Sequence, residues 1–412
     1  MLKIAFNRPF LTGNEINYIN DVLSGGKICG NGVYTQKCQN FFKERLGSRK
    51  CLLTTSCTDA LEMCAMLADI KPGDEVIVPS YTFVSTALAF TRQGAKVVFA
   101  DSLATHPCID PAGIEQLITP KTKAIIVVHY AGVACDMDAF KKIAHEHNLL
   151  LIEDAAQAVD SYYINREGDP VVDFFKANSS KGDGAKSCNI NKDVTEDCKK
   201  LPLGSIGDLA AFSFHETKNI QCGEGGLLAI NNQSLVRRAE ILWEKGTNRA
   251  EFFRGEINKY GWVDTGSSFL PNEYTAAFLW AQLEQMTQIQ QRRRELWNRY
   301  YNNLYSKTPL KMPFLPGYAT NNAHMFYVTT QTPAERTALI QHLKDNGINA
   351  VFHYLSLHKS RFAVDNGMGG ANLPMADYYT DCLLRLPLFG ALTEQEVDYV
   401  TKNIIEFYNN NL

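Results

Sequence analysis

Residues 149–158 read LLLIEDAAQA, an apolar run that ends in two carboxylates, Glu153 and Asp154. An uninterrupted apolar run of this length is typical of a strand buried on both faces of a parallel sheet. Ligands of open α/β sheets bind outside the carboxyl ends of such strands. A carboxylate at that point costs several kcal/mol to bury unless a cation pairs with it. Asp154 is therefore either a helix-capping residue or the partner of a cationic ligand.

Working outward from this strand, apolar runs alternate with amphipathic segments over the first two-thirds of the chain. The predicted strands are residues 51–55, 72–79, 95–101, 123–130 and 209–214. The predicted helices are residues 58–68, 84–94 and 137–148, with a further helix start at Asp110–Pro111. This alternation indicates an α/β fold with a mostly parallel central sheet in a large domain, residues 1–245.

The pattern changes twice along the chain. Residues 166–200 are rich in Asn, Asp, Lys, Gly and Ser, which predicts a polar surface insertion. After residue 245, a long amphipathic stretch at 273–304 and shorter segments predict a smaller α+β domain, residues 246–412.

Composition is that of a well-packed globular protein, with 412 residues, 45% of them apolar and 21% charged. A net charge of −3 gives no reason to expect nucleic acid or an anionic membrane as a partner. The N-terminus lacks the basic start and apolar core of a signal peptide. None of the eleven cysteines forms a CxxC pair, so we expect mostly free thiols in a cytoplasmic protein.

Two further stretches carry chemical groups. Lys218 lies in SFHETKNIQCGEGG, residues 213–226, between an apolar strand and a glycine cluster that lets backbone approach a ligand. Ser56, Cys57 and Thr58 precede a helix, where they either cap it or bind a phosphate. An amine, a strand-end carboxylate and an anion cradle are the three groups that pyridoxal phosphate requires. For Lys218 to act as the nucleophile, its pKa has to fall.

Several segments together resemble the nucleotide-sugar aminotransferases of the DegT/DnrJ/EryC1/StrS family. The segments that carry the resemblance are PSYTFVSTA, VVHYAGVACDMD, IEDAAQA, GSIGDLAAFSFHETKN, GEGG, EKGTNR, HMFYV, VFHYLSLH and LRLPLF. The resemblance implies the fold of type I pyridoxal-phosphate enzymes and a homodimer with active sites at its interface. The resemblance is interrupted by the polar insertion. A second departure is GSSFL, which stands where many relatives have a GxNxR-like segment that reaches the cofactor phosphate of the partner subunit. Ser267 or Ser268 is the candidate for that contact here.

The resemblance also assigns roles to individual residues. Lys218 matches the Schiff-base lysine, which also moves protons to the sugar carbon, and Asp154 matches the partner of the pyridinium nitrogen. Gln157 matches the residue at the cofactor's 3-hydroxyl. Phe83 matches the aromatic ring that stacks on the cofactor, with plain core packing as the alternative. The phosphate contacts implied by the resemblance are Cys57, Thr58 and Ser213.

The candidate substrate contacts are histidines and arginines. His129, His324, His353 and His358 are either substrate contacts or structural hydrogen-bonding groups. Arg249 and Arg254 are candidates for the substrate diphosphate, because a guanidinium binds phosphate in a bidentate manner. The run Arg292 to Arg294 is expected to be a solvated helix face.

Within the family, FSFHETKN, EKGTNRAEFFRG and DTGSSFL resemble the subgroup that forms TDP-4-amino-4,6-dideoxygalactose. This implies transfer of an amino group from glutamate to C4 of a TDP-linked 4-keto-6-deoxyhexose. Three alternatives stay open: a sugar 3-aminotransferase, an enzyme that forms the 4-amino-4,6-dideoxyglucose epimer, and a catalytically silent sugar-binding regulator. Related dehydratases have histidine in place of the lysine, so Lys218 argues against that branch.

Overall fold

The structure is a computed structural model, and it describes residues 3–165 and 199–411. The insertion predicted at residues 166–200 therefore lies, except for its last two residues, outside the described residues. Its two flanks are described. Strands β6 (Tyr162–Asn165) and β7 (Lys199–Pro202) pair antiparallel, with Asn165 opposite Lys199. The two residues that flank the segment thus lie side by side.

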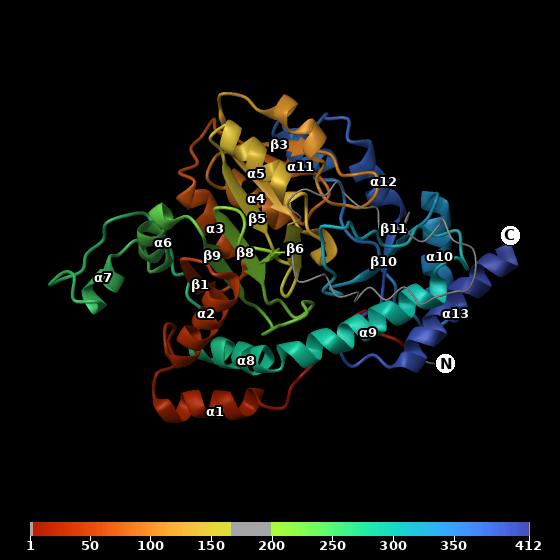
Figure 1. Cartoon of the computed structure of the whole chain (residues 1–412), viewed down its shortest axis with the longest axis horizontal. Helices are drawn as coiled ribbons and strands as arrows, with labels where there is room; N and C mark the ends of the chain where they lie inside the picture. Colours follow the sequence, from red (N-terminus) through yellow and green to blue (C-terminus); the bar gives the residue numbers. More distant parts are fainter. Residues whose placement is uncertain (1–2, 166–198, 412) are drawn as a thin grey trace.

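A seven-stranded sheet forms the centre of the molecule (Figure 1). Its strands are β1 (Lys50–Thr54), β2 (Glu75–Pro79), β3 (Lys96–Ala100), β4 (Thr122–Val128), β5 (Leu150–Asp154), β8 (Leu209–Ser213) and β9 (Gly226–Ile230). The order is β1-β9-β8-β5-β4-β2-β3, and only the two pairings made by β9 are antiparallel. The prediction of an α/β fold with a mostly parallel sheet is confirmed.

Helices cover the sheet and extend from it. They are α1 (Glu15–Gly25), α2 (Val33–Leu46), α3 (Cys57–Leu67), α4 (Val84–Thr91), α5 (Met137–Glu146), α6 (Val236–Trp243), α7 (Arg249–Phe253), α8 (Glu273–Glu284), α9 (Met286–Leu304), α10 (Pro333–Asp345), α11 (Arg361–Asp365), α12 (Pro374–Cys382) and α13 (Glu394–Asn411). Helix α1 packs on α8, and α9 packs on α13 (Figure 1). The amphipathic stretch at 273–304 forms two helices separated at Gln285. One expectation needs correction: Asp110 caps only a short 3-10 turn, Pro111–Gly113.

The C-terminal part has its own two-stranded sheet, in which β10 (Phe326–Thr329) pairs antiparallel with β11 (Leu383–Leu386). Its buried side chains form a second apolar cluster, distinct from the core around the seven-stranded sheet. Leu296 and Tyr300 of α9 belong to this second cluster, whereas Leu279 of α8 belongs to the first. A domain boundary near residue 245 stays a prediction.

Candidate active site

The predicted cofactor residues lie at one edge of the sheet, because parallel strands end at the same edge. Asp154 is the last residue of β5, and Ser213 is the last residue of β8. Gly226 begins β9 opposite both Ser213 and Thr54, the last residue of β1. This is the edge at which open α/β sheets bind ligands.

Asp154 is buried, and two hydrogen-bond donors among the described residues reach its carboxylate. The Thr86 hydroxyl donates to Oδ2 at 2.8 Å, and the backbone N–H of Ala156 donates to Oδ1 at 3.1 Å. Burial raises the pKa of Asp154, and the Thr86 bond, the Ala156 N–H and the charge of Lys218 oppose that rise. A carboxylate that is buried with so little compensation suits a cationic partner better than a capping role.

Lys218 lies after β8, in the turn that leads to β9, and its side chain is half-buried. Burial lowers the pKa of the Lys218 ammonium, while Cys57 and Asp154 act in the opposite direction. Burial also raises the pKa of the Cys57 thiol well above its usual range, so Cys57 is neutral. An amine with a lowered pKa beside a buried carboxylate has the properties of a nucleophile.

Helix α3 begins with its first turn open toward the same edge. The Ser56 hydroxyl caps it by accepting from the Asp59 N–H at 3.1 Å, and the Thr58 hydroxyl bonds the Ser85 hydroxyl at 2.8 Å. A Cβ at Gly226 would lie 2.3 Å from the Ser56 carbonyl and 2.5 Å from the Cys57 nitrogen. Only glycine therefore allows β9 to approach this helix start, where free N–H groups favour an anion.

An exposed aromatic ring lies in front of this edge. The side chain of Phe83, at the start of α4, is 56% exposed and 6.1 Å from the Tyr354 ring. This excludes the alternative of plain core packing. Gln157 is held between the Ala131 N–H, which donates to Oε1 at 2.6 Å, and the Tyr354 hydroxyl, to which its Nε2 donates at 2.9 Å.

His129 was predicted to contact substrate, and the structure contradicts this. The ring is fully buried. Its Nδ1 accepts from the Cys135 N–H at 3.2 Å, so Nε2 carries the hydrogen and donates to Glu153 at 2.9 Å. Glu153 also accepts from the N–H groups of Gly204, Ile206 and Gly207. No polar ring atom of His129 is left for a ligand, and the pair joins two strands to the 204–207 turn.

The other three histidines differ in their surroundings. His324 bonds the Asn219 side chain, and His353 bonds the Tyr130 hydroxyl at 2.7 Å while stacking on Tyr354. Burial lowers the pKa of both well below the usual range, and Lys218 and Arg385 lower both further. Both imidazoles are therefore neutral and near the lysine.

His358 has a structural role. Its Nδ1 bonds the Ser80 hydroxyl at 2.7 Å, and its side chain is buried. This contact ties the 3-10 turn Leu357–Lys359 to Ser80, the residue after the end of β2. The structural alternative left open for this histidine is thus the one that the structure supports.

The two predicted diphosphate ligands are not brought to Lys218 within one chain. Figure 1 shows α7, which begins with Arg249, at the edge of the molecule and away from β5 and β8. Arg254 has two close ion pairs, with Glu240 at 2.8 Å and Glu256 at 2.7 Å. Arg249 has one longer ion pair, with Glu244 at 3.5 Å, and its guanidinium lies over Phe253.

Two arginines were missed or misjudged from the sequence. Arg385 of β11 points its guanidinium over the Phe6 ring at 4.6 Å, and no carboxylate among the described residues pairs with it. Its buried Nε has no hydrogen-bond partner. Arg293 is buried instead of solvated, bonded to the backbone carbonyls of Ala323, His324 and Leu388. Arg385 was detectable as a lone cation within LLRLPLF, an otherwise apolar run.

The residues present fit pyridoxal phosphate. Lys218 would hold its aldehyde carbon, Asp154 its ring nitrogen, Phe83 its ring face, and the start of α3 with Ser213 its phosphate. This cofactor requires an anion site, a carboxylate for its ring nitrogen and a surface for its ring. The structure offers the helix start beside Gly226, the buried carboxylate of Asp154 and the exposed ring of Phe83. These assignments of single residues remain predictions.

Residues 9–405 match the model of the DegT/DnrJ/EryC1/StrS aminotransferase family. The chain belongs to this family. It is 29% identical over 409 residues to the spore coat polysaccharide biosynthesis protein SpsC of Bacillus subtilis, covering 97% of this chain and 96% of the relative. Among solved structures, the aminotransferase TlmJ of Streptoalloteichus hindustanus has a TM-score of 0.84 at 26% identity, with 100% of both chains covered. Spr1654 of Streptococcus pneumoniae, in its PLP form, has a TM-score of 0.84 at 24% identity over 100% of both chains, which supports the fold.

The predictions of an aminotransferase and of its cofactor are confirmed. The protein is a pyridoxal-phosphate-dependent aminotransferase with the type I fold. The alternative of a catalytically silent regulator is accordingly set aside. The nine cysteines in the described part of the chain are free thiols. In residues 3–165 and 199–411, no helix has the length and apolar character to cross a membrane.

Proposed function

We propose that this aminotransferase transfers the amino group of glutamate to C4 of a TDP-linked 4-keto-6-deoxyhexose, and that it works as a cytoplasmic homodimer. The product is TDP-4-amino-4,6-dideoxygalactose. Membership of the family and the relative in polysaccharide biosynthesis support a sugar substrate. The resemblance of the segments around Lys218 and residues 244–270 supports the C4 subgroup.

One observation carries the proposal. Near Lys218 lie the Arg385 guanidinium, which has no carboxylate partner among the described residues, and two neutral imidazoles, those of His324 and His353. The charge of Arg385 lowers the pKa of Lys218, and the charge of Lys218 lowers the pKa of His324. A guanidinium that lacks a carboxylate partner suits the carboxylate of an amino acid donor. Neutral imidazoles suit the hydroxyls of a sugar. One site can thus serve an anionic donor and a hydroxylated acceptor in turn.

The cofactor, when bound, supplies the electron sink that stabilises negative charge at the carbon losing or gaining a proton. The residues of the chain supply the rest. Asp154 would hold the protonated ring nitrogen of the cofactor, because its carboxylate is buried and accepts hydrogen bonds from Thr86 and Ala156. Lys218, with its lowered pKa, takes the proton from the donor's α-carbon and returns one at C4 of the sugar.

Arg249 is the diphosphate ligand that we retain. Both side chains are exposed, but Arg249 has a single ion pair at 3.5 Å, whereas Arg254 has two at 2.7–2.8 Å. Because α7 lies away from β5 and β8 in its own chain, this assignment requires the partner subunit's site to receive it (Figure 1). The homodimer is therefore part of the proposal and not separate from it.

The test is the product. Purified protein is incubated with TDP-4-keto-6-deoxyglucose and glutamate, 2-oxoglutarate is measured, and the amino sugar is examined by proton NMR. A small H3–H4 coupling supports the axial C4 amine of the galacto product, and a large one identifies the gluco epimer. Amination at C3, or no 2-oxoglutarate, contradicts the proposal.

A further inference from the structure

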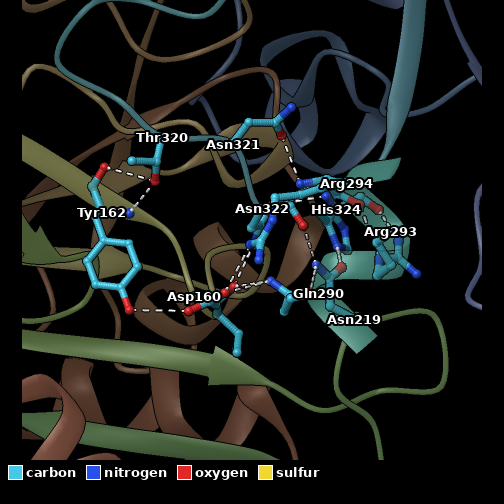
Figure 2. A network of polar contacts seen from close by, with 12 residues as sticks. Asp160, Tyr162, Asn219, Gln290, Arg293, Arg294, Thr320, Asn321, Asn322 and His324 are labelled. Atoms are coloured by element: carbon cyan, nitrogen blue, oxygen red, sulfur yellow. Dashed lines mark hydrogen bonds and ion pairs between the residues drawn. The ribbon is translucent and has the colours of Figure 1, made fainter. Parts of the chain in front are cut away.

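A buried network of amides connects the lysine turn to the C-terminal part of the chain (Figure 2). Asn219, the residue after Lys218, is buried. Its Nδ2 donates to Gln290 Oε1 and to the backbone carbonyl of Asn322, both at 2.8 Å, and its Oδ1 lies 2.9 Å from His324 Nδ1. All three contacts of this side chain are inside the protein.

The orientation of the Asn219 amide follows from these partners. The carbonyl of Asn322 can only accept a hydrogen bond, so it requires the NH₂ end of Asn219. Gln290 is fixed in the same way, because its own Nε2 donates to the carbonyl of Val159 at 3.3 Å and leaves Oε1 as an acceptor. A flipped Asn219 would set its oxygen against two acceptors. Oδ1 of Asn219 therefore faces His324.

The tautomer of His324 follows in turn. Oδ1 of Asn219 has no hydrogen to give, so His324 Nδ1 must carry one, and in the neutral ring Nε2 is then an acceptor. The backbone is held as well: the His324 N–H donates to Asn322 Oδ1 at 3.0 Å, and Arg293 Nη2 donates to the His324 carbonyl at 2.7 Å. Within residues 3–165 and 199–411, Nε2 makes no hydrogen bond.

The charged groups around the ring keep it neutral. Burial lowers the pKa of His324 well below the usual range, and the cations Lys218, Arg293 and Arg385 lower it further. No carboxylate contributes to the shift of this pKa, so nothing among the described residues opposes the neutral form.

We propose that Asn219 is a positioning residue that holds His324 in the Nδ1–H tautomer, so that Nε2 accepts a hydrogen bond from a hydroxyl of the bound keto sugar. This inference rests on the proposed function, since it names a sugar as the ligand. The amino acid donor has no hydroxyl to offer, and the interaction therefore belongs to the sugar half of the reaction.

A matched pair of variants separates the two ring nitrogens. His324→Asn keeps an N–H donor for Asn219 and removes Nε2, whereas His324→Gln keeps an oxygen near the Nε2 position and loses the bond to Asn219. We expect His324→Asn to lower kcat/KM for the keto sugar about ten- to hundredfold, with His324→Gln retaining more of it. Single-turnover loss of the amino group from glutamate should stay within threefold in both. Equal losses in the two variants, or equal losses in both half-reactions, overturn the proposal.

Asn219→Asp tests the positioning role through pH. One carboxylate oxygen of this variant accepts from Nδ1, and the other replaces Nδ2 opposite the Asn322 carbonyl and Gln290 Oε1. The negative charge favours the imidazolium, so the pKa of His324 rises and Nε2 becomes a donor at low pH. The sugar half-reaction should then fall as pH decreases and recover as pH increases, over a range in which the wild-type rate is flat. A uniform loss at every pH would indicate a merely structural residue and would refute the inference.

A readout without substrate keeps this inference distinct from the proposed function. In ¹⁵N-histidine-labelled apoprotein, long-range proton–nitrogen correlations report which ring nitrogen bears hydrogen, and the signal absent from His324→Asn identifies the residue. An Nδ1–H tautomer supports the inference, and an Nε2–H tautomer or an imidazolium at neutral pH overturns it. If the wild type fails to aminate the keto sugar, the proposed function fails while the tautomer result stands by itself.

Discussion

Replacing Asp154 with asparagine removes a charge and little else. The side-chain oxygen can still accept from the Ala156 N–H, as Oδ1 does now at 3.1 Å. What is lost is the negative partner of the cofactor's ring nitrogen. Removing one member of a buried ion pair costs about 3–5 kcal/mol. At about 1.36 kcal/mol for each tenfold, Asp154→Asn should lower turnover by roughly two to four powers of ten.

In the apoprotein, the same substitution should raise stability relative to wild type as pH rises. Burial raises the pKa of Asp154 above its unfolded value of about 3.9, so the folded protein binds more protons than the unfolded chain between those two pKa values. The free energy of unfolding contributed by this group therefore falls as pH rises through that window. Asp154→Asn lacks the effect, and its melting temperature relative to wild type should increase with pH.

Both results are needed. Turnover is followed by 2-oxoglutarate release with saturating pyridoxal phosphate, and apoprotein melting by circular dichroism from pH 4 to pH 8. Thr86→Ser is the control, because it keeps the hydroxyl that donates to Asp154 Oδ2 and should behave as wild type. Turnover of Asp154→Asn within tenfold of wild type would refute the assignment and would mean that the ring nitrogen has another partner.

Three further predictions concern Lys218, Gly226 and residues 166–198. Lys218→Ala should abolish turnover and the visible absorption of the lysine-bound cofactor while the protein stays folded, and any sustained catalysis would exclude Lys218 as the nucleophile. Gly226→Ala should weaken pyridoxal phosphate binding roughly five- to hundredfold in a fluorescence titration. Its Cβ would lie 2.3 Å from the Ser56 carbonyl, so the backbone must shift, and such overpacking costs about 1–3 kcal/mol. Gly25→Ala, whose Cβ meets nothing within 4 Å, is the control. Replacing residues 166–198 with a short glycine-containing turn should leave turnover within a few-fold, because Asn165 and Lys199 already lie opposite each other; loss of cofactor binding or of dimerisation would show that this segment builds the site or the interface.

The sheet edge could be predicted because its signals are local. The apolar run before Asp154 indicates a buried parallel strand, and strand ends of one sheet share an edge, so Asp154 and Lys218 were expected together. His129 was a candidate because it lies in a family-like segment, and that resemblance misplaced it. Its role depends on Glu153 in the neighbouring strand and on the backbone of Cys135, and neither contact leaves a mark in the sequence.

Arginines show a second limit. Arg293 and its two neighbours form one charged run, but a helix turns about 100° per residue, so one member of the run faces inward. Which one does so depends on the register of α9 against the second apolar cluster, and that is a tertiary property. Arg254 and Arg249 look alike in sequence, and only the positions of Glu240 and Glu256 distinguish them.

The pairing of the central sheet also determines what a cut between β6 and β7 would do. Among the described strands, β1 pairs only with β9, and β5 of the first half pairs with β8 of the second, so neither half can complete the sheet alone. Asp154 lies in one half and Lys218 in the other. We expect two co-expressed fragments, 1–165 and 199–412, to assemble through these strands, and catalytic activity to be restored only on their reassociation. The chain thus offers a natural position for a split enzyme whose activity reports the meeting of its two parts.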